Sequence, residues 1–232
     1  MDKPEERRNF YGRVHGKTLR ASQKDYLARD LERLRLPAVA VHENPSRRLL
    51  DPAAIFGGQR PLWVEVGFGG GEHLVHMAAL YPDVGIVGCE PFVNGVAMLL
   101  GKIRAAGVTN LAIHPGDARD LFDVLPEGAV ARVFLNYPDP WPKARHHRRR
   151  FVTPGYLALL ARVMAPGAEF RVATDIADYV RQTLEEVPKA GFDLISQTGA
   201  GQAWDDWIST RYEKKALREG RPPHYLTFRR VG

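Results

Sequence analysis

Val64-Glu65-Val66-Gly67-Phe68-Gly69-Gly70-Gly71-Glu72 is the stretch of sequence that decides the fold. Apolar, β-favouring residues from Leu62 onward lead into it, and an amphipathic run up to Leu80 follows it. This order predicts a strand, a tight turn and a helix, which together form the first unit of a nucleotide-binding α/β sheet. Gly67 and Gly69 can adopt positive φ, which allows the backbone to approach a ligand closely.

Two kinds of ligand bind turns of this shape. A dinucleotide site requires a third glycine where this chain has Glu72, and a carboxylate there would repel a pyrophosphate, which disfavours a nicotinamide dehydrogenase. The spacing acidic-x-G-x-G-x-G from Glu65 to Gly71 instead resembles the S-adenosylmethionine loop of Rossmann-like methyltransferases. That methyl donor carries no phosphate, and an acid at the strand end can face its ammonium and sulfonium charges. The alternative is a glycine-rich turn that binds no ligand.

Composition limits the class of protein. The chain has 232 residues, of which 44% are hydrophobic, enough to bury one sizeable core. Its net charge of +6 favours a polyanionic partner. Cys89 is the only cysteine in the sequence, so we expect no disulfide framework and no metal site. The sequence has no apolar run of membrane-spanning length and no signal-peptide core, and we therefore expect a cytoplasmic protein with no membrane association.

Strand-like and helix-like runs alternate from residue 62 onward. We expect strands at 62–66, 84–89, 110–114, 130–136, 168–173, 192–196 and 224–230, and helices at 72–80, 92–106, 118–124, 154–164 and 176–187. Thr153, Pro154 and Gly167 mark the start and the end of the helix at 154–164. The alternation predicts a mostly parallel seven-stranded sheet with helices on both faces, whose ligands lie at the carboxyl ends of the strands.

The N-terminal part of the chain is polar and positively charged. We expect residues 1–45 to form a basic arm that is partly disordered, with a short helix over 26–36, and residues 46–232 to form the catalytic domain. The arm carries cations that include Arg7, Arg8 and Arg13, with Phe10 and Tyr11 between them. Such a segment either binds nucleic acid loosely or is a solvated extension without a role.

Acidic residues follow the second and third predicted strands. Glu90 lies 25 residues after Glu65, near the usual offset for a carboxylate that accepts hydrogen bonds from both ribose hydroxyls. Asp117 stands in a Gly-Asp-Ala segment that resembles the methyltransferase segment that holds adenine. The alternative for each is an acid that caps the following helix. Three acids at three successive strand ends are more specific than one.

The fourth predicted strand leads into Tyr137-Pro138-Asp139-Pro140-Trp141-Pro142-Lys143, followed by four arginines and two histidines up to Arg150. Three prolines within five residues make this loop stiff. The alternative is a turn followed by a solvated charged face. Arginine and lysine bind phosphates, and aromatic faces stack on unpaired bases, so the segment favours a nucleic-acid substrate.

These segments together resemble the bacterial tRNA (guanine-N7)-methyltransferases, which modify a guanine in the variable loop, at position 46, of tRNA. The resemblance extends over nearly all of residues 7–228. Its most specific parts are Pro138-Asp139-Pro140-Trp141-x-Lys143-x-Arg145-His146-x-x-Arg149-Arg150, Ala173-Thr174-Asp175 and Thr210-x-Tyr212-Glu213. It implies a class I, Rossmann-like methyltransferase fold that uses S-adenosylmethionine and tRNA, as a monomer or homodimer with no obligatory protein partner. The chain departs from the family pattern at Asn136-Tyr137 and at Pro222-Pro223.

The resemblance also implies roles for individual residues. The residues that bind the methyl donor would be Glu65, Gly67, Gly69, Gly71, Glu90, Asp117 and Asp139, and Asp139 would also be catalytic. Those that meet the substrate would be Lys143, Asp175, Thr210, Arg211, Tyr212 and Glu213. Those that contact RNA would be Arg145, His146, His147, Arg148, Arg149 and Arg150. For Asp175 the alternative is a helix cap. For residues 204–215 the alternative is an ordinary amphipathic helix that packs its two tryptophans.

Guanine N7 has no proton to lose, so the expected methyl transfer needs no general base, and Asp139 would stabilise the charge that develops on the purine. Two rival functions remain open. One is an amino methyltransferase acting on exocyclic nitrogens of another nucleic acid or of protein, because Asn136-Tyr137-Pro138-Asp139-Pro140 faintly resembles the loop of that class. The other is a non-catalytic RNA-binding module with a vestigial cofactor loop.

Overall fold

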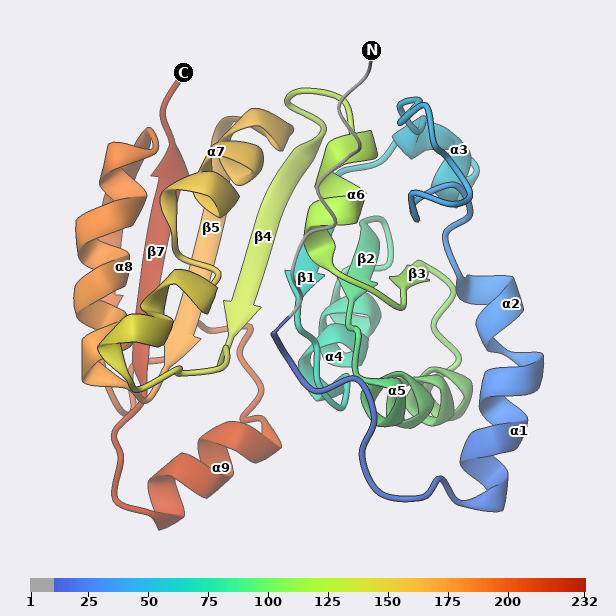
Figure 1. Ribbon diagram of the computed structural model, residues 1–232, viewed down its shortest axis with the longest axis horizontal. Coiled ribbons are helices and arrows are strands. Elements are labelled where there is room, and N and C mark those ends of the chain that lie inside the picture. Colours follow the sequence, from blue (N-terminus) through green and yellow to red (C-terminus); the bar gives the residue numbers. More distant parts are fainter. Residues whose placement is uncertain (1–10) are drawn as a thin grey trace.

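Within residues 11–232, which the computed structural model describes, seven strands form one sheet in the order β3-β2-β1-β4-β5-β7-β6 (Figure 1). The strands are β1 (Leu62–Val66), β2 (Gly85–Cys89), β3 (Leu111–His114), β4 (Val130–Asn136), β5 (Met164–Thr174), β6 (Phe192–Thr198) and β7 (His224–Arg230). Strand β7 runs antiparallel to β5 and β6, and the other neighbouring strands are parallel. The predicted mostly parallel seven-stranded sheet is confirmed.

Helices cover both faces of the sheet (Figure 1). They are α1 (Ala21–Arg29), α2 (Leu31–Leu34), α3 (Pro52–Phe56), α4 (Glu72–Leu80), α5 (Val93–Ala106), α6 (Ala118–Val124), the 3₁₀-helix η1 (Ala144–Arg149), α7 (Pro154–Val163), α8 (Ala177–Lys189) and α9 (Arg211–Arg218). Among the described residues, no helix is both long and apolar enough to cross a membrane.

Side chains alternate between two hydrophobic cores along β1. Leu62 and Val64 pack with α6, α7 and α8 on one face, and Trp63 packs with α4 and α5 on the other. A parallel strand that is buried on both faces has a nearly continuous run of apolar residues. This is why the sequence of β1 predicts a parallel strand. Because helices cover both faces of the sheet, a ligand can bind at the edge where the parallel strands end, and there it would contact the loops that follow the strands.

The described part of the expected N-terminal arm packs against the rest of the chain. Leu36 and Val39 are buried in the core, and the Leu36 backbone N–H donates to the Ile113 carbonyl at 2.8 Å. The helix expected over 26–36 is two helices, α1 and α2, and the Tyr26 ring of α1 lies against α5 at Gly101. The domain boundary at residue 45 stays a prediction.

Residues 11–20 form an extended segment that is fastened to the start of α5. Val93 donates its backbone N–H to the Val14 carbonyl at 2.9 Å, and the Asn94 side chain exchanges hydrogen bonds with Gly16 and Lys17 at 2.8 and 2.7 Å. Arg7, Arg8 and Phe10 of the predicted arm lie outside the described residues.

One further expectation about secondary structure is wrong, and one alternative is excluded. Strand β5 begins at Met164, directly after α7, so Gly167 lies inside the strand with φ of 81° and does not follow a helix end. Residues 204–207 form a turn, and α9 begins only at Arg211, so an amphipathic helix over 204–215 is not present. Local sequence could not reveal either boundary, because both depend on pairing with distant strands.

Asn110 closes the connection between α4 and β2. Its buried side-chain amide lies within 3.1 Å of the Ala78, Tyr81 and Val84 carbonyls, and it shares its two hydrogens among them. The Tyr81 carbonyl also accepts from the Val84 N–H at 3.1 Å. Asn110 therefore links the end of α4, the connection after it and the residue before β2.

Replacing Asn110 with alanine should lower the free energy of unfolding by about 2 kcal/mol, because buried acceptors lose their donor. Urea unfolding measures the change. The control is Asp193→Ala on β6, where an exposed side chain should change stability by less than about 0.5 kcal/mol. Equal effects of the two substitutions would contradict the assignment.

Candidate active site

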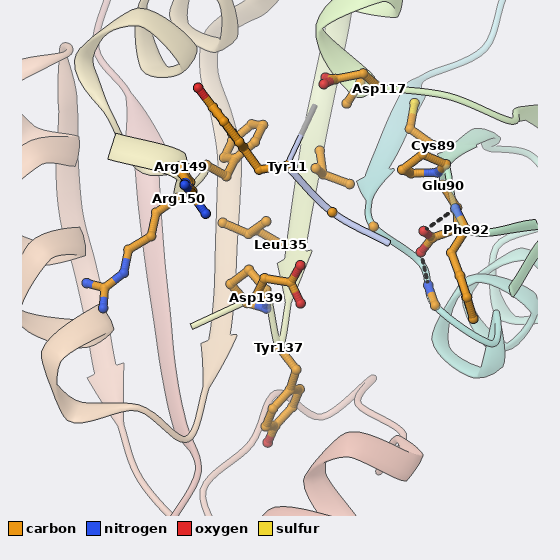
Figure 2. A pocket seen from close by; sticks show the side chains of 18 of the residues that line it. Tyr11, Cys89, Glu90, Phe92, Asp117, Leu135, Tyr137, Asp139, Arg149 and Arg150 are labelled. Carbon is orange, nitrogen blue, oxygen red and sulfur yellow. Dashed lines mark hydrogen bonds between the residues drawn. The ribbon is translucent and has the colours of Figure 1, made fainter. Parts of the chain in front are cut away.

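A cavity of about 420 Å³ lies at the carboxyl ends of β1, β2, β3 and β4 (Figure 2). A volume in this range fits a small-molecule ligand. The polar lining residues include Glu90, Asp117 and Asp139, which come from the ends of three different strands. Of the four acids expected to face the methyl donor, these three converge on one space, whereas Glu65 does not line it.

The glycine turn forms one wall of the cavity. Gly67, Gly69 and Gly71 have φ of 71°, 56° and 76°, values that side-chain-bearing residues rarely adopt. Gly67 and Gly69 line the cavity, whereas Gly71 caps α4 and faces Leu99 of α5. Lys102 holds the turn from outside, since its ammonium donates to the Gly70 carbonyl at 2.6 Å. Gly67 and Gly69 thus form part of the cavity wall, and Gly71 caps helix α4.

Glu90 connects the end of β2 to the glycine turn. One carboxylate oxygen accepts from the Gly69 N–H at 2.7 Å, and the other accepts from the Phe92 N–H at 2.9 Å (Figure 2). Burial raises the pKa of Glu90 to about 7, and the nearby negative charge of Asp139 adds to the shift. The carboxylate is therefore held in place by two backbone donors while it faces the cavity.

Asp117 follows β3. Its position is compatible with both roles considered for it, a contact with adenine and a cap of the following helix. It caps α6, accepting from the Arg119 backbone N–H at 2.9 Å, and it also lines the cavity. The Arg119 guanidinium holds the carboxylate at distances of 2.6 to 3.0 Å and stacks over the Tyr156 ring at 4.4 Å. An aromatic ring and a fixed carboxylate thus border the same end of the cavity.

Glu65 does not line the cavity, although the sequence placed it there. Its carboxylate points to the α4 face, where it contacts the His73 Nδ1 at 2.9 Å and accepts from the Asn136 amide at 3.4 Å. Glu65 is 2% exposed. The period-two alternation of β1 explains this position, because Val66 and not Glu65 faces the cavity side. A direct contact between Glu65 and the methyl donor is not part of this geometry.

The loop after β4 contains two residues with strained backbone conformations. Tyr137 and Trp141 have φ of 50° and 40°, which is uncommon for residues with side chains and costs free energy at each position. The Tyr137 N–H donates to the Ala173 carbonyl at 2.7 Å, which fixes the loop to β5. Between the strained residues, Asp139 faces the same space as Glu90, while the Tyr137 side chain points away (Figure 2). Burial raises the pKa of Asp139.

Sequence reasoning missed several aromatic residues of the cavity. Phe92, Phe151 and Tyr156 line it, and Tyr11 reaches it from the N-terminal segment. The Arg149 guanidinium lies between Tyr11 and Trp141, 4.7 and 4.9 Å from the two ring centres. The alternation of cations and aromatics in the arm was the available signal, but no local pattern shows which ring meets which cation.

The residues predicted to contact RNA, from Arg145 to Arg150, lie in different environments. Arg145 and Arg148 are exposed on η1, while His147 contacts the Asp178 carboxylate at 3.3 Å. Partial burial and the surrounding cations lower the pKa of His146. Arg150 is only 1% exposed, and its guanidinium donates to the Pro140 carbonyl at 2.8 Å and pairs with Asp178 at 2.9 Å.

In this structure the Arg150 side chain holds the loop and is not exposed for a contact with RNA, so its predicted RNA contact stays a prediction. The distinction between Arg150 and its neighbours could not be seen in a run of cations. It depends on Gln182 and Asp178 of α8, which lie far away in the sequence.

The predicted substrate residues surround the cavity but only one of them lines it. Lys143 is exposed at the start of η1, and Asp175 accepts from Arg221 at 2.5 Å and does not cap α8. Arg211 lies over the Tyr212 ring at 4.9 Å, and Tyr212 reaches the cavity wall at Gly69.

Thr210 and Glu213 form the first turn of α9. The Thr210 hydroxyl caps the helix by accepting from the Glu213 N–H at 3.3 Å. Glu213 is 4% exposed, and its carboxylate accepts from the Trp207 indole at 3.0 Å and from the Tyr225 hydroxyl. In this geometry both residues stabilise the helix that carries Tyr212, and their predicted contact with guanine stays a prediction.

Comparison with known proteins finds related methyltransferases. A family model described as a putative methyltransferase matches residues 59–226. A tRNA (guanine-N(7)-)-methyltransferase of Paracoccus denitrificans is 73% identical over 97% of this chain and 95% of its own length. The protein of the same name in Cereibacter sphaeroides is 74% identical over 97% of this chain and 92% of its own.

Among solved structures, the 16S rRNA (adenine(1408)-N(1))-methyltransferase of Catenulisporales acidiphilia superposes with a TM-score of 0.57. It covers 79% of this chain and 92% of that one at 20% identity, which supports the class I methyltransferase fold alone. The full-length matches at high identity are more specific, and the chain belongs to the tRNA (guanine-N(7)-)-methyltransferase family.

Proposed function

We propose that this chain transfers a methyl group from S-adenosylmethionine to N7 of a guanine in the variable loop of tRNA. The observation that carries the proposal is the convergence of Glu90, Asp117 and Asp139 on one cavity beside a glycine turn, in a chain 73% identical to a protein named for this reaction. The relatives supply the reaction, and the cavity supplies a place for it in this chain.

The residues of the cavity fit this methyl donor. Glu90 offers a fixed carboxylate to ribose hydroxyls, and Asp117 with Tyr156 offers an acceptor and a ring face to adenine. Acidic groups suit a donor that is positively charged and has no phosphate. When bound, S-adenosylmethionine supplies an electrophilic methyl group on a sulfonium. Its cationic sulfur is compatible with the negative charge that Asp139 brings to the cavity.

The chain's own task is to orient the guanine and to stabilise charge. The N7 lone pair lies in the ring plane and carries no proton, so no residue has to act as a general base. Methyl transfer would move positive charge from sulfur to the purine, and the Asp139 carboxylate, which lines the cavity, would stabilise the charge there. The strained loop fixes Asp139 before the substrate arrives, so that most of the rate comes from alignment and electrostatics.

The exposed cations Lys143, Arg145 and Arg148 lie on the same loop as Asp139. Phosphate contacts from such side chains provide most of the affinity for RNA and position it without reading its sequence. The tRNA would therefore dock on η1 with the target base directed to the cavity. A cytoplasmic enzyme that works as a monomer or homodimer, without an obligatory protein partner, is part of the proposal.

The structure disfavours the amino-methyltransferase rival. That function would need the Asn136 amide near the target nitrogen, but Asn136 is 8% exposed, lies outside the cavity lining and donates toward Glu65. A non-catalytic RNA-binding module would not need three acids held around one cavity. Both rivals are decided by the same experiment.

That experiment incubates the purified protein with unmodified tRNA and a methyl-labelled donor, followed by nucleoside analysis. Label recovered as 7-methylguanosine supports the proposal. Label on an exocyclic amine supports the rival enzyme class. No label, in a protein that binds S-adenosylhomocysteine tightly, would reject transfer to tRNA.

Asp139→Asn keeps the shape of the side chain and removes its charge. It should lower kcat by about a hundredfold, since one preorganised electrostatic group is lost. Affinity for S-adenosylhomocysteine, measured by calorimetry, should change several times less. The exposed Asp193→Asn serves as the control for the general effect of removing a charge. Equal losses in kcat and in product affinity would contradict the catalytic assignment.

The double substitution Arg145→Gln and Arg148→Gln should weaken tRNA binding and make it less sensitive to salt. Each lost phosphate contact should reduce the slope of log affinity against log salt by about one. The matched control is Arg229→Gln, an exposed arginine on β7. Filter binding at several salt concentrations measures both, and an unchanged slope would place the RNA elsewhere.

Glu90 provides a test by pH in the absence of any ligand. Its pKa rises from 4.5 to about 7 on folding, chiefly through burial, so between these values the folded chain binds more protons than the unfolded chain. The wild type should therefore lose stability relative to Glu90→Gln as pH rises from about 5 to 8, by up to about 3 kcal/mol. Urea unfolding across this pH range measures the difference, and parallel stability curves would contradict the burial of the charge.

A further inference from the structure

The segment between β6 and α9 is fastened to the sheet by the Asp206 carboxylate and by the Trp204 indole, which donates to the Thr227 hydroxyl of β7 at 2.8 Å. Asp206 accepts from the Arg171 guanidinium at 2.8 and 3.1 Å and from the Tyr81 hydroxyl at 3.0 Å. Its backbone carbonyl lies 3.1 Å from His76 Nε2 of α4. The neighbouring Asp205 is exposed. Of the two adjacent aspartates in this turn, Asp206 therefore makes the contacts to the sheet, whereas Asp205 faces solvent.

The surface beneath Asp206 has balanced charge and little access to water. Arg132 of β4 lies 3.7 Å from Asp206, and Glu169 of β5 pairs with Arg132 at 3.0 Å and with Arg171 at 3.2 Å. The two guanidinium groups also lie over the Trp63 and Trp204 rings, at 4.2 and 5.2 Å. Two cations thus face two carboxylates, and removal of one carboxylate leaves an uncompensated positive charge in a half-buried place.

A short chain of contacts leads from this cluster to the cavity. Trp207 follows Asp206 and donates to Glu213 of α9, and the ring stacks near His73 at 5.2 Å. The next residue on α9 toward its N-terminus is Tyr212. A methyl group built on Gly69 would lie 2.9 Å from the Tyr212 ring, so the ring is pressed against the glycine turn.

We propose that Asp206 is a positioning residue for the methyl transfer: it fixes the 204–207 turn to the sheet and thereby holds Tyr212 of α9 against the glycine turn. The assignment of Tyr212 to the reaction rests on the proposed function. Asp206 itself does not line the cavity and acts only through α9. Loss of its charge releases the start of α9 while the acids at the strand ends stay in place.

The first test uses hydrogen exchange and needs no substrate. In Asp206→Asn, backbone amides of residues 207–213 should exchange at least about fivefold faster than in the wild type, whereas those of β1 and α5 should not change. Asp205→Asn is the matched control and should leave all of them unchanged. Unchanged exchange at 207–213 in Asp206→Asn would overturn the proposal. Asp206→Glu, which keeps the charge, should restore part of the protection.

The second test is kinetic and separates positioning from a general loss of stability. Asp206→Asn should lower kcat/KM for tRNA about tenfold at a temperature at which the variant is fully folded. Combining it with Tyr212→Ala should cost little more than Tyr212→Ala alone, because both changes remove the same contact. Multiplicative losses would overturn the proposal.

Phe192→Leu, a core substitution remote from the cavity, controls for lowered melting temperature. If it reduces kcat/KM as much as Asp206→Asn, Asp206 is only a stabilising residue and the proposal fails. A wild-type chain inactive on tRNA would reject the proposed function, while the exchange experiment would still decide whether Asp206 holds α9.

Discussion

The structure depends on the close approach of three backbone segments at Gly69. Its N–H donates to Glu90 at the end of β2, and its carbonyl lies where a side chain on Gly95 of α5 would have to be, 2.3 Å from that carbon. Only glycine at both positions allows the turn and the helix to meet. This contact places the end of β1 beside the end of β2, and the acids of the cavity can then share one space.

The site is formed at a cost to the stability of the fold. Glu90 and Asp139 are carboxyl groups whose pKa burial raises, and Tyr137 and Trp141 have backbone conformations that other loops avoid. Contacts to neighbouring segments hold the strained loop, above all the hydrogen bond from Arg150 to the Pro140 carbonyl. The buried arginine that sequence reasoning assigned to RNA is thus what keeps Asp139 in position.

The strands, the glycine turn, Glu90 and Asp117 could be predicted from the sequence, because each has a local pattern of period two, spacing or strand-end position. The assignment of Asp139 to the methyl donor needed the family resemblance. The direction of Glu65 could also have been derived from the alternation along β1, since Val66 faces the cavity. Other features depend on contacts between distant residues. The burial of Arg150 needs α8, and the start of α9 needs the sheet face that Asp206 meets, so neither has a local signature.

Both ends of the described chain complete the cavity that the central sheet begins. Tyr11 comes from the segment before α1, and Tyr212 comes from α9 near the C-terminus, yet both line the same space. The strand ends supply charges fixed by the sheet, whereas these two rings also depend on contacts between distant segments, through Val93 and Asn94 on one side and Asp206 and Trp207 on the other. Tyr11 additionally contacts the Arg149 guanidinium, so the N-terminal segment and the loop after β4 meet at the cavity.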